Sequence, residues 1–314
     1  MQNTHNNRSL NYEDNEIDIR ELFRVILKGK WIIISMTSFF SIAAVIFSLS
    51  LPNIYQSSGL VNTIEQRDEM LGALSSYSNL AGIAGINLPQ SGGSNATKAK
   101  RKLTSLSFFE NNVLPYIYLP ELMAVKYWDS NNNSIVFDEE IYNVRTNTWI
   151  RNFSYPQKKI PSSQESLNVF LVDHLSISED NKTGFITISI RHQSPYIAKE
   201  WVELLVSQIN IYYRQVDKET AIKKANYLNT QIIKTNLSEV KEMLAELLQA
   251  ETKVLTLIEA NKDYVYEYID PPAVMEIKSE PRRALICIFG ALLGGVLSIF
   301  IVLLRYLLFK EKNS

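Results

Sequence analysis

The sequence predicts an α+β fold in which two transmembrane helices flank an outer domain. That domain is expected to have a mixed sheet and helix base near the membrane and one very long protruding helix. Three observations predict this fold. Uncharged apolar runs lie near both ends of the 314-residue chain, β-leaning stretches follow the first run and precede the second, and no proline or glycine occurs between Pro195 and Pro271.

The two apolar runs cover residues 31–51 and 284–304. Each has roughly 20 residues, and a helix of that length spans a hydrocarbon core about 30 Å thick. The first run begins well inside the chain, and Leu51-Pro52-Asn53 follows it in place of a cleavage site with small residues. We therefore interpret it as an uncleaved membrane anchor and not as a signal peptide.

Basic residues around the first run predict the orientation in the membrane. Four lie in the twenty positions before it: Arg20, Arg24, Lys28 and Lys30. Only Arg67 is basic in the twenty positions after it. Because cytoplasmic flanks carry the excess of Lys and Arg, we expect cytoplasmic tails at residues 1–30 and 305–314. Residues 52–283 then form a domain outside the cytoplasm.

The outer domain is expected to begin and end with strands. A hairpin is predicted because Ile186, Ile188 and Ile190 occupy every second position after a polar turn. The expected elements, in chain order, are a strand (54–61), a Gly-rich loop or broken helix (72–95), a short amphipathic helix (98–114), surface loops (130–134 and 156–166), a hairpin (175–190), the long helix (about 195–258) and a last β stretch (264–269).

The long helix is predicted to begin at Ser194-Pro195, a helix-capping residue followed by proline at the first helical position. Its second half carries an apolar seam with steps of three or four that only Glu251 interrupts: Leu237, Val240, Leu244, Leu247, Val254 and Ile258. Such a seam needs a partner helix. The periodicity alone leaves two partners open, namely other segments of the same chain or the same helix in neighbouring subunits.

Composition excludes several classes of function. The chain has 32 Lys and Arg against 33 Asp and Glu, which argues against a nucleic-acid partner. One Cys and three His are too few for a zinc cluster. Phosphate-binding loops, nucleophile elbows and HExxH motifs are absent from the sequence, so no catalytic residue and no cofactor is predicted.

One segment resembles a calcium-binding loop. Asp129, Asn131, Asn133 and Glu140 occupy loop positions 1, 3, 5 and 12. Ser134 stands where the sharp turn of such a loop favours glycine. This departure makes a solvated Asn-rich turn the preferred interpretation, with a calcium site as the alternative.

The second apolar run contains small residues spaced by four, Gly290 and Gly294, with Gly295 beside them. Such spacing lets helix backbones approach closely in lipid, and we expect a helix–helix contact here. The alternative is that these glycines simply face lipid.

Several stretches resemble the Wzz-type polysaccharide co-polymerases, the chain-length determinants of bacterial surface polysaccharides. Residues 16–24 with Lys30-Trp31 resemble the family's entry to its first membrane helix, and residues 51–57 resemble the exit. Further along the chain, the likeness covers residues 80–85 with Leu103, Ser105, Phe108 and Phe109. At the C-terminal end it covers residues 270–283 with Gly290, Gly294 and Gly295. The family usually has a proline-rich segment before its second membrane helix, and Pro271, Pro272 and Pro281 match it. Met275 and Lys278 stand where more prolines are common.

The resemblance implies a protein of the bacterial inner membrane with a periplasmic domain and a ring-like homo-oligomer. It further implies a non-enzymatic regulator that acts with a membrane polysaccharide polymerase on the chain length of lipopolysaccharide O-antigen. The growing glycan is a possible ligand, with Tyr212, Tyr213 and Tyr227 as sugar-stacking groups or, as we prefer, as helix-packing groups. The alternatives are a capsule or exopolysaccharide export co-polymerase and a two-span sensor or adaptor with a periplasmic ligand-binding domain.

Overall fold

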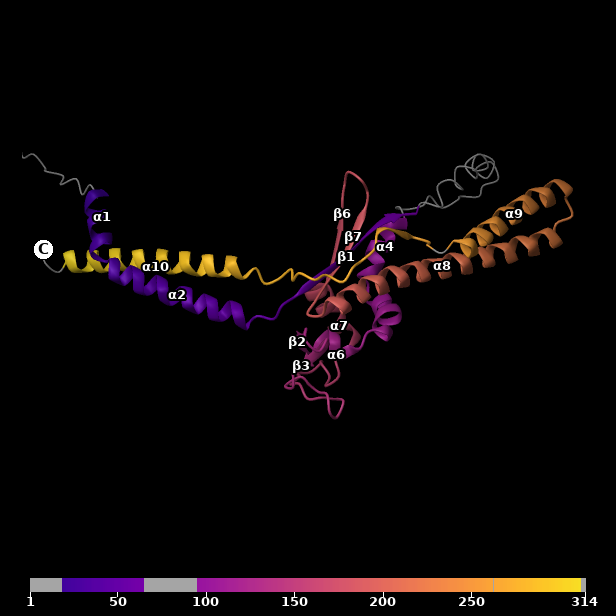
Figure 1. Cartoon of the computed structure of the whole chain (residues 1–314). Coiled ribbons are helices and arrows are strands. Elements are labelled where there is room, and N and C mark those ends of the chain that lie inside the picture. Colours follow the sequence, from indigo (N-terminus) through magenta and orange to yellow (C-terminus); the bar gives the residue numbers. More distant parts are fainter. Residues whose placement is uncertain (1–18, 65–94, 262, 312–314) are drawn as a thin grey trace, which may run out of the picture. The chain divides into compact units, whose positions relative to one another are not determined.

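The computed structural model describes residues 19–64, 95–261 and 263–311 (Figure 1). The chain divides into two compact units, which are described separately. One consists of residues 1–51 and 281–314, and the other of residues 52–280. The predicted Gly-rich loop at 72–95 lies, except for its last residue, outside the described part of the chain.

The described part of the first unit contains three helices, α1 (Ile19–Lys28), α2 (Lys30–Ser50) and α10 (Arg283–Glu311). Two of them, α2 and α10, are long and apolar enough to cross a membrane, and most of their side chains are exposed. The core helix of a soluble protein would bury such side chains, so the exposed apolar surface favours the predicted membrane spans.

A four-stranded antiparallel sheet forms the base of the second unit. Its strands are β1 (Tyr55–Thr63), β6 (Leu175–Glu179), β7 (Ile186–His192) and β8 (Tyr266–Asp270), in the order β6-β7-β1-β8. The predicted first strand, hairpin and last β stretch are thereby confirmed. The first and last strands of the unit pair with each other, with a bulge between Leu60 and Val61.

Short helices and hairpins complete the base. The helices are α4 (Asn95–Leu103), α5 (Leu106–Phe108), the π-helix Phe109–Val113, the 3₁₀ turn Leu114–Tyr116, α6 (Leu119–Met123), α7 (Ser163–Val169) and the π-helix Phe170–His174. The hairpins pair β2 (Val125–Asp129) with β3 (Ser134–Phe137), and β4 (Tyr142–Asn143) with β5 (Thr148–Trp149).

Two predicted segments differ in detail. The amphipathic helix expected at 98–114 is broken, because the side chain of Ser105 caps a new turn by accepting a hydrogen bond from the Phe108 N–H at 3.4 Å. The surface loop expected at 156–166 ends early, because α7 begins at Ser163. There the Ser162 hydroxyl accepts from the Glu165 N–H at 3.3 Å.

The prediction of a single helix at about 195–258 is wrong. Two helices occupy this stretch, α8 (Pro195–Lys234) and α9 (Ser238–Ala260), and Thr235 and Leu237 between them have extended backbones. Thr and Asn are weak helix formers, so the Thr235-Asn236 step allows the chain to turn without proline or glycine. The reversal lets α9 pack along α8 in an α-helical hairpin (Figure 1).

The core lies between the sheet, the short helices and the first half of α8. The Ser194 hydroxyl caps α8 by accepting from the Ile197 N–H at 3.5 Å, as the sequence predicts. Buried side chains come from every layer: Val61, Phe108, Phe109, Phe170, Ile186, Ile188, Ile190, Trp201, Leu205, Ile209 and Tyr266. Gly59 of β1 belongs to this close packing, because a Cβ there would lie 3.2 Å from Val202 of α8.

Candidate functional site

The glycines of α10 pack against α2 of the same chain. A Cβ atom at Gly290 would collide with Ala44, and one at Gly294 would lie 2.7 Å from Phe40 Cβ. Gly295 is less crowded, since its nearest neighbour is Thr37 Oγ1 at 3.9 Å. Only glycine allows this approach of the two backbones, so Gly290 and Gly294 determine how closely the spans pack.

The proline-rich segment runs from β8 toward α10 without helix or strand over residues 271–279. Its polar groups are tied to β1. The Ser57 hydroxyl donates to the Ala273 carbonyl at 2.8 Å, and the Ile54 N–H donates to the Glu280 carbonyl at 2.9 Å. Pro272 is buried, whereas Pro271 is exposed and Pro281 is the first residue of the C-terminal segment of the first unit. This segment therefore follows the first strand closely, although it forms no continuous ladder with it.

Ion pairs connect the two helices of the hairpin. Lys224 lies 3.1 Å from Glu251, and Lys218 pairs with Glu259. The pair with Lys224 explains why a carboxylate interrupts the predicted seam at Glu251. Near the base, Arg214 donates to the Asn261 carbonyl at 2.7 Å.

The predicted seam residues differ in burial within this hairpin. Ile258 is 2% exposed, and Leu237 at the helix turn is 68% exposed. The other four, Val240, Leu244, Leu247 and Val254, are partly buried. The seam therefore has a partner in its own chain, α8, and retains apolar surface for further contacts.

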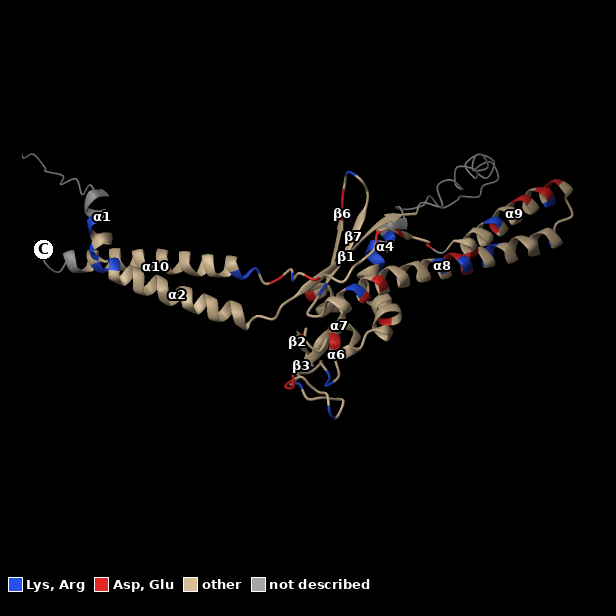
Figure 2. Ribbon diagram, viewed as in Figure 1, with Lys and Arg blue, Asp and Glu red and all other residues tan. Residues whose placement is uncertain are grey.

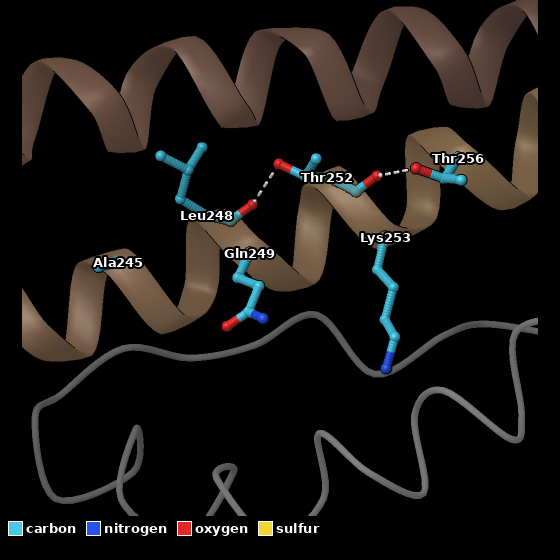
Figure 3. Close-up of a pocket in the computed structure, with 6 residues that line it drawn as sticks. All are labelled: Ala245, Leu248, Gln249, Thr252, Lys253 and Thr256. Atoms are coloured by element: carbon cyan, nitrogen blue, oxygen red, sulfur yellow. Dashed lines mark hydrogen bonds between the residues drawn. The ribbon is translucent and has the colours of Figure 1, made fainter.

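Another face of α9 forms a shallow open pocket (Figure 3), lined by Ala245, Leu248, Gln249, Thr252, Lys253 and Thr256. The hydroxyls of Thr252 and Thr256 donate to backbone carbonyls one turn earlier, at 2.8 and 3.0 Å. These internal bonds use the hydroxyl protons and leave only Gln249 and Lys253 with side-chain donors for a ligand. Among the described residues that line the pocket, no group of side chains is arranged for catalysis.

A buried imidazole pair joins the base to the start of α8. The rings of His174 and His192 stack with centroids 5.5 Å apart, and both contact Trp201 edge-on. Since a carbonyl only accepts, His174 Nδ1 donates to Arg191 O at 2.7 Å and His192 Nε2 donates to Glu121 O at 3.0 Å.

The remaining nitrogen of His192 determines its charge. Its Nδ1 accepts from the Ser194 N–H at 2.9 Å, so the neutral ring uses both nitrogens. Burial lowers the pKa of His192 to about 3 and also lowers the pKa of His174. The pair is therefore uncharged at neutral pH. Its contacts indicate a structural role at the helix cap.

Asn210 links α8 to β8. Its amide donates to the Tyr266 carbonyl at 2.8 Å, and its Oδ1 accepts from the N–H groups of Val265 and Tyr266 at 2.8 and 2.9 Å. A buried side chain that satisfies three backbone groups fixes the position of the last strand against the helix. The sequence offered no signal for this role, because a single Asn in a helix has no distinctive spacing.

The calcium-loop candidate is the turn of the β2–β3 hairpin. Asp129 accepts from the Asn131 N–H at 3.0 Å and from the Asn132 amide at 2.7 Å, while Asn133 accepts from the Trp128 indole at 3.0 Å. These bonds lower the pKa of Asp129. Glu140 instead lies in a later turn capped by Asp138. Three of the four candidate oxygen ligands thus share one turn, and two of them already accept hydrogen bonds within it.

The three tyrosines have different environments. Tyr212 packs edge-on against Phe108 and Tyr213, with the ammonium of Lys102 4.6 Å from its ring centroid. Burial raises the pKa of Tyr213, whereas Tyr227 on the hairpin is exposed. This arrangement supports the packing interpretation for the first two residues, and Tyr227 has an accessible ring.

Comparison with known proteins gives a family match for the first third of the chain. Residues 15–112 match the family model described as Wzz, chain length determinant protein. This part of the chain is therefore similar to a Wzz chain length determinant domain. The matched segment includes α1, α2, β1, α4 and α5, so it covers the first apolar helix with its approach and the first strand of the base.

Two solved structures are similar to the chain as well. A full-length bacterial polysaccharide co-polymerase has 14% identity and a TM-score of 0.39, over 95% of this chain and 100% of its own. A fragment of WzzB, a polysaccharide co-polymerase from Salmonella Typhimurium, has 13% identity and a TM-score of 0.28, over 73% and 100%. Among curated proteins, no sequence matches the chain.

Proposed function

We propose that this protein regulates the chain length of a surface polysaccharide as a non-enzymatic co-polymerase, with lipopolysaccharide O-antigen as the glycan. The match of residues 15–112 to the Wzz family carries the proposal, since members of that family regulate polymerisation and are not enzymes. Two apolar helices with exposed surfaces support a location in the inner membrane. In this proposal residues 52–283 are periplasmic and both termini are cytoplasmic.

The proposed assembly is a homo-oligomer that works with a membrane polysaccharide polymerase. Apolar side chains left uncovered on the hairpin support contacts between copies, with Leu237 the most exposed of the predicted seam residues. The close packing of α10 on α2 at Gly290 and Gly294 supports a defined membrane surface that a polymerase can contact. Tyr227 provides one accessible ring for the growing glycan.

The direct test is a gel of surface polysaccharide from the native host with and without this gene, stained to show the ladder of chain lengths. Loss of a preferred length with polymer still made is the expected result, and the gene supplied in trans restores it. An unchanged ladder would contradict the proposal and would favour a role in another glycan pathway or as a sensor or adaptor.

A second experiment tests the packing of the membrane helices. Leu at Gly290 and Gly294 forces α10 away from Ala44 and Phe40, so both the oligomer size in detergent and the preferred glycan length should change. Val296→Leu is the matched control, because Val296 lies on the exposed face of the same helix. Identical oligomers and glycan profiles for all variants would remove the membrane helices from the mechanism.

A further inference from the structure

Helix α1 has an apolar face that the protein covers only in part. At 100° per residue, Phe23 and Leu27 form one exposed strip, 66% and 60% exposed, while Ile26 beside it and Val25 on the opposite side of the helix are partly buried. Arg24 and Lys28, also four positions apart, form the adjoining strip and are exposed as well. The helix thus presents a basic edge directly beside an uncovered apolar edge.

A ten-residue helix has little stability of its own in water, and α1 is also too short to span a bilayer. It ends at Lys28, and only Gly29 separates it from α2, which begins at Lys30. A Cβ at Gly29 would lie 2.6 Å from Val302 of α10, so the elbow between α1 and α2 packs closely on the second span. Figure 1 shows α1 turning away from the line of α2 at this elbow.

The same end of the helix pair carries groups typical of a membrane interface. Trp31, the second residue of α2, is 75% exposed, and Lys30 of α2 and Arg305 of α10 are exposed as well. Figure 2 shows the basic residues gathered on α1 and at the start of α2. Exposed Trp and Lys at the ends of membrane spans lie at the level of the lipid headgroups.

We propose that α1 lies in the plane of the bilayer surface, with Phe23 and Leu27 in the boundary between headgroups and acyl chains. Arg24 and Lys28 then contact the phosphates of anionic phospholipids. The uncovered apolar strip, its continuity with a membrane span and the complementary charge all fit this occupant. The inference rests on the insertion of α2 and α10 into a membrane and is independent of glycan chain length.

The test places a nitroxide label on the full chain in lipid vesicles, using Leu27→Cys in a Cys287→Ser background. The label should collide readily with oxygen, which concentrates in lipid, and be shielded from a water-soluble nickel chelate. Ile233→Cys is the matched control, because Ile233 is also an exposed apolar helix residue, 75% exposed against 60% for Leu27, in the other unit. Its label should be open to the nickel chelate.

Lipid composition and charge variants test the headgroup contact. Vesicles with phosphatidylglycerol should hold more of the Leu27 label in the immersed state than vesicles of phosphatidylcholine alone. Each basic residue near an anionic surface changes partitioning roughly fivefold, so Arg24→Gln with Lys28→Gln should lower the immersed-to-free ratio roughly thirtyfold. Lys158→Gln with Lys182→Gln, exposed in the other unit, should leave it unchanged.

Three outcomes would overturn the proposal. A Leu27 label open to the nickel chelate in both lipids means that α1 stays in water. A label shielded from both reagents means that protein, such as a second copy, covers this face. Immersion that depends neither on phosphatidylglycerol nor on the two basic residues removes the contact with anionic headgroups. None of these outcomes depends on the polysaccharide ladder, so this inference and the proposed function can fail separately.

Discussion

The two halves of α8 are held in different ways. From Pro195 to Asn210 the helix is packed in the core, and Trp201, Leu205 and Ile209 are almost completely buried. From Ile211 to Lys234 its neighbour is α9, most of its side chains are only partly buried or exposed, and two ion pairs connect the helices. One continuous helix therefore begins in a protein interior and ends on a surface.

The difference shows that the base, and not the hairpin, sets the stability of the second unit. Apolar burial contributes far more per residue than exposed ion pairs, which are screened by solvent. The hairpin is then free to present surface to partners. The predictions below test this contrast, from the largest expected effect to the smallest.

Ile209→Ala should lower the free energy of unfolding of the detergent-solubilised protein by about 2–5 kcal/mol, because it removes buried methylene groups and leaves a cavity. The control is Ile233→Ala in the hairpin half of the same helix. Ile233 is largely exposed, so its variant should stay within about 0.5 kcal/mol of the parent. Urea unfolding followed by intrinsic fluorescence measures both, and equal losses would refute the contrast.

Asn210→Ala should cost about 2–3 kcal/mol, since it leaves buried backbone groups of Val265 and Tyr266 without their partner. Asn226→Ala, at an exposed position on the hairpin half, should have little effect. Hydrogen exchange gives a local readout: the amides of β8 should exchange faster in the first variant only. Unchanged protection of β8 would contradict the role of Asn210 as a link.

A fall in pH should destabilise the sheet-and-helix base of the second unit, because the unfolded chain protonates His192 more readily than the folded protein does. Its pKa is about 3 in the folded protein and about 6.5 in the unfolded chain, so the unfolded state binds the extra proton as pH falls from 6.5 toward 3. The contribution of His192 to the free energy of unfolding is fully present above pH 6.5 and is smaller by about 2 kcal/mol at pH 5. Urea unfolding at both pH values tests this.

His192→Gln is the control variant, because it keeps a donor and an acceptor but does not titrate in this range. It should lose part of the pH dependence that the parent shows between 6.5 and 5. An identical pH dependence in parent and variant would mean that His192 is not the group responsible.

The smallest effect is expected for the ion pair between Lys224 and Glu251 in the hairpin. A double-mutant cycle to Ala should give a coupling energy below about 1 kcal/mol, reduced further by salt. The reference is the pair of Arg151 and Glu165, which is less exposed and bidentate and whose guanidinium lowers the pKa of Glu165. The coupling energy of this pair should be the larger of the two. A larger coupling energy for Lys224 and Glu251 would contradict the inference that burial determines how much each contact contributes to stability.

The sequence by itself determined the features whose signals are local. Apolar length indicated the two helices that can span a membrane, alternation of Ile186, Ile188 and Ile190 indicated β7, and Ser194-Pro195 located the start of α8. Each rests on residues that are neighbours along one element, where periodicity and capping act directly.

Tertiary structure alone decided the features that depend on residues far apart in the chain. The break at 235–237 was missed, because a turn made of Thr and Asn lacks the usual helix-ending residues and is stabilised by the packing of α9 on α8. The stacking of His174 on His192 and the bonds of Asn210 to β8 likewise need a folded sheet to bring their partners together. The spacing of residues along a sequence predicts helices, strands and caps, which are local. Contacts such as these form only when the folded core brings distant residues together.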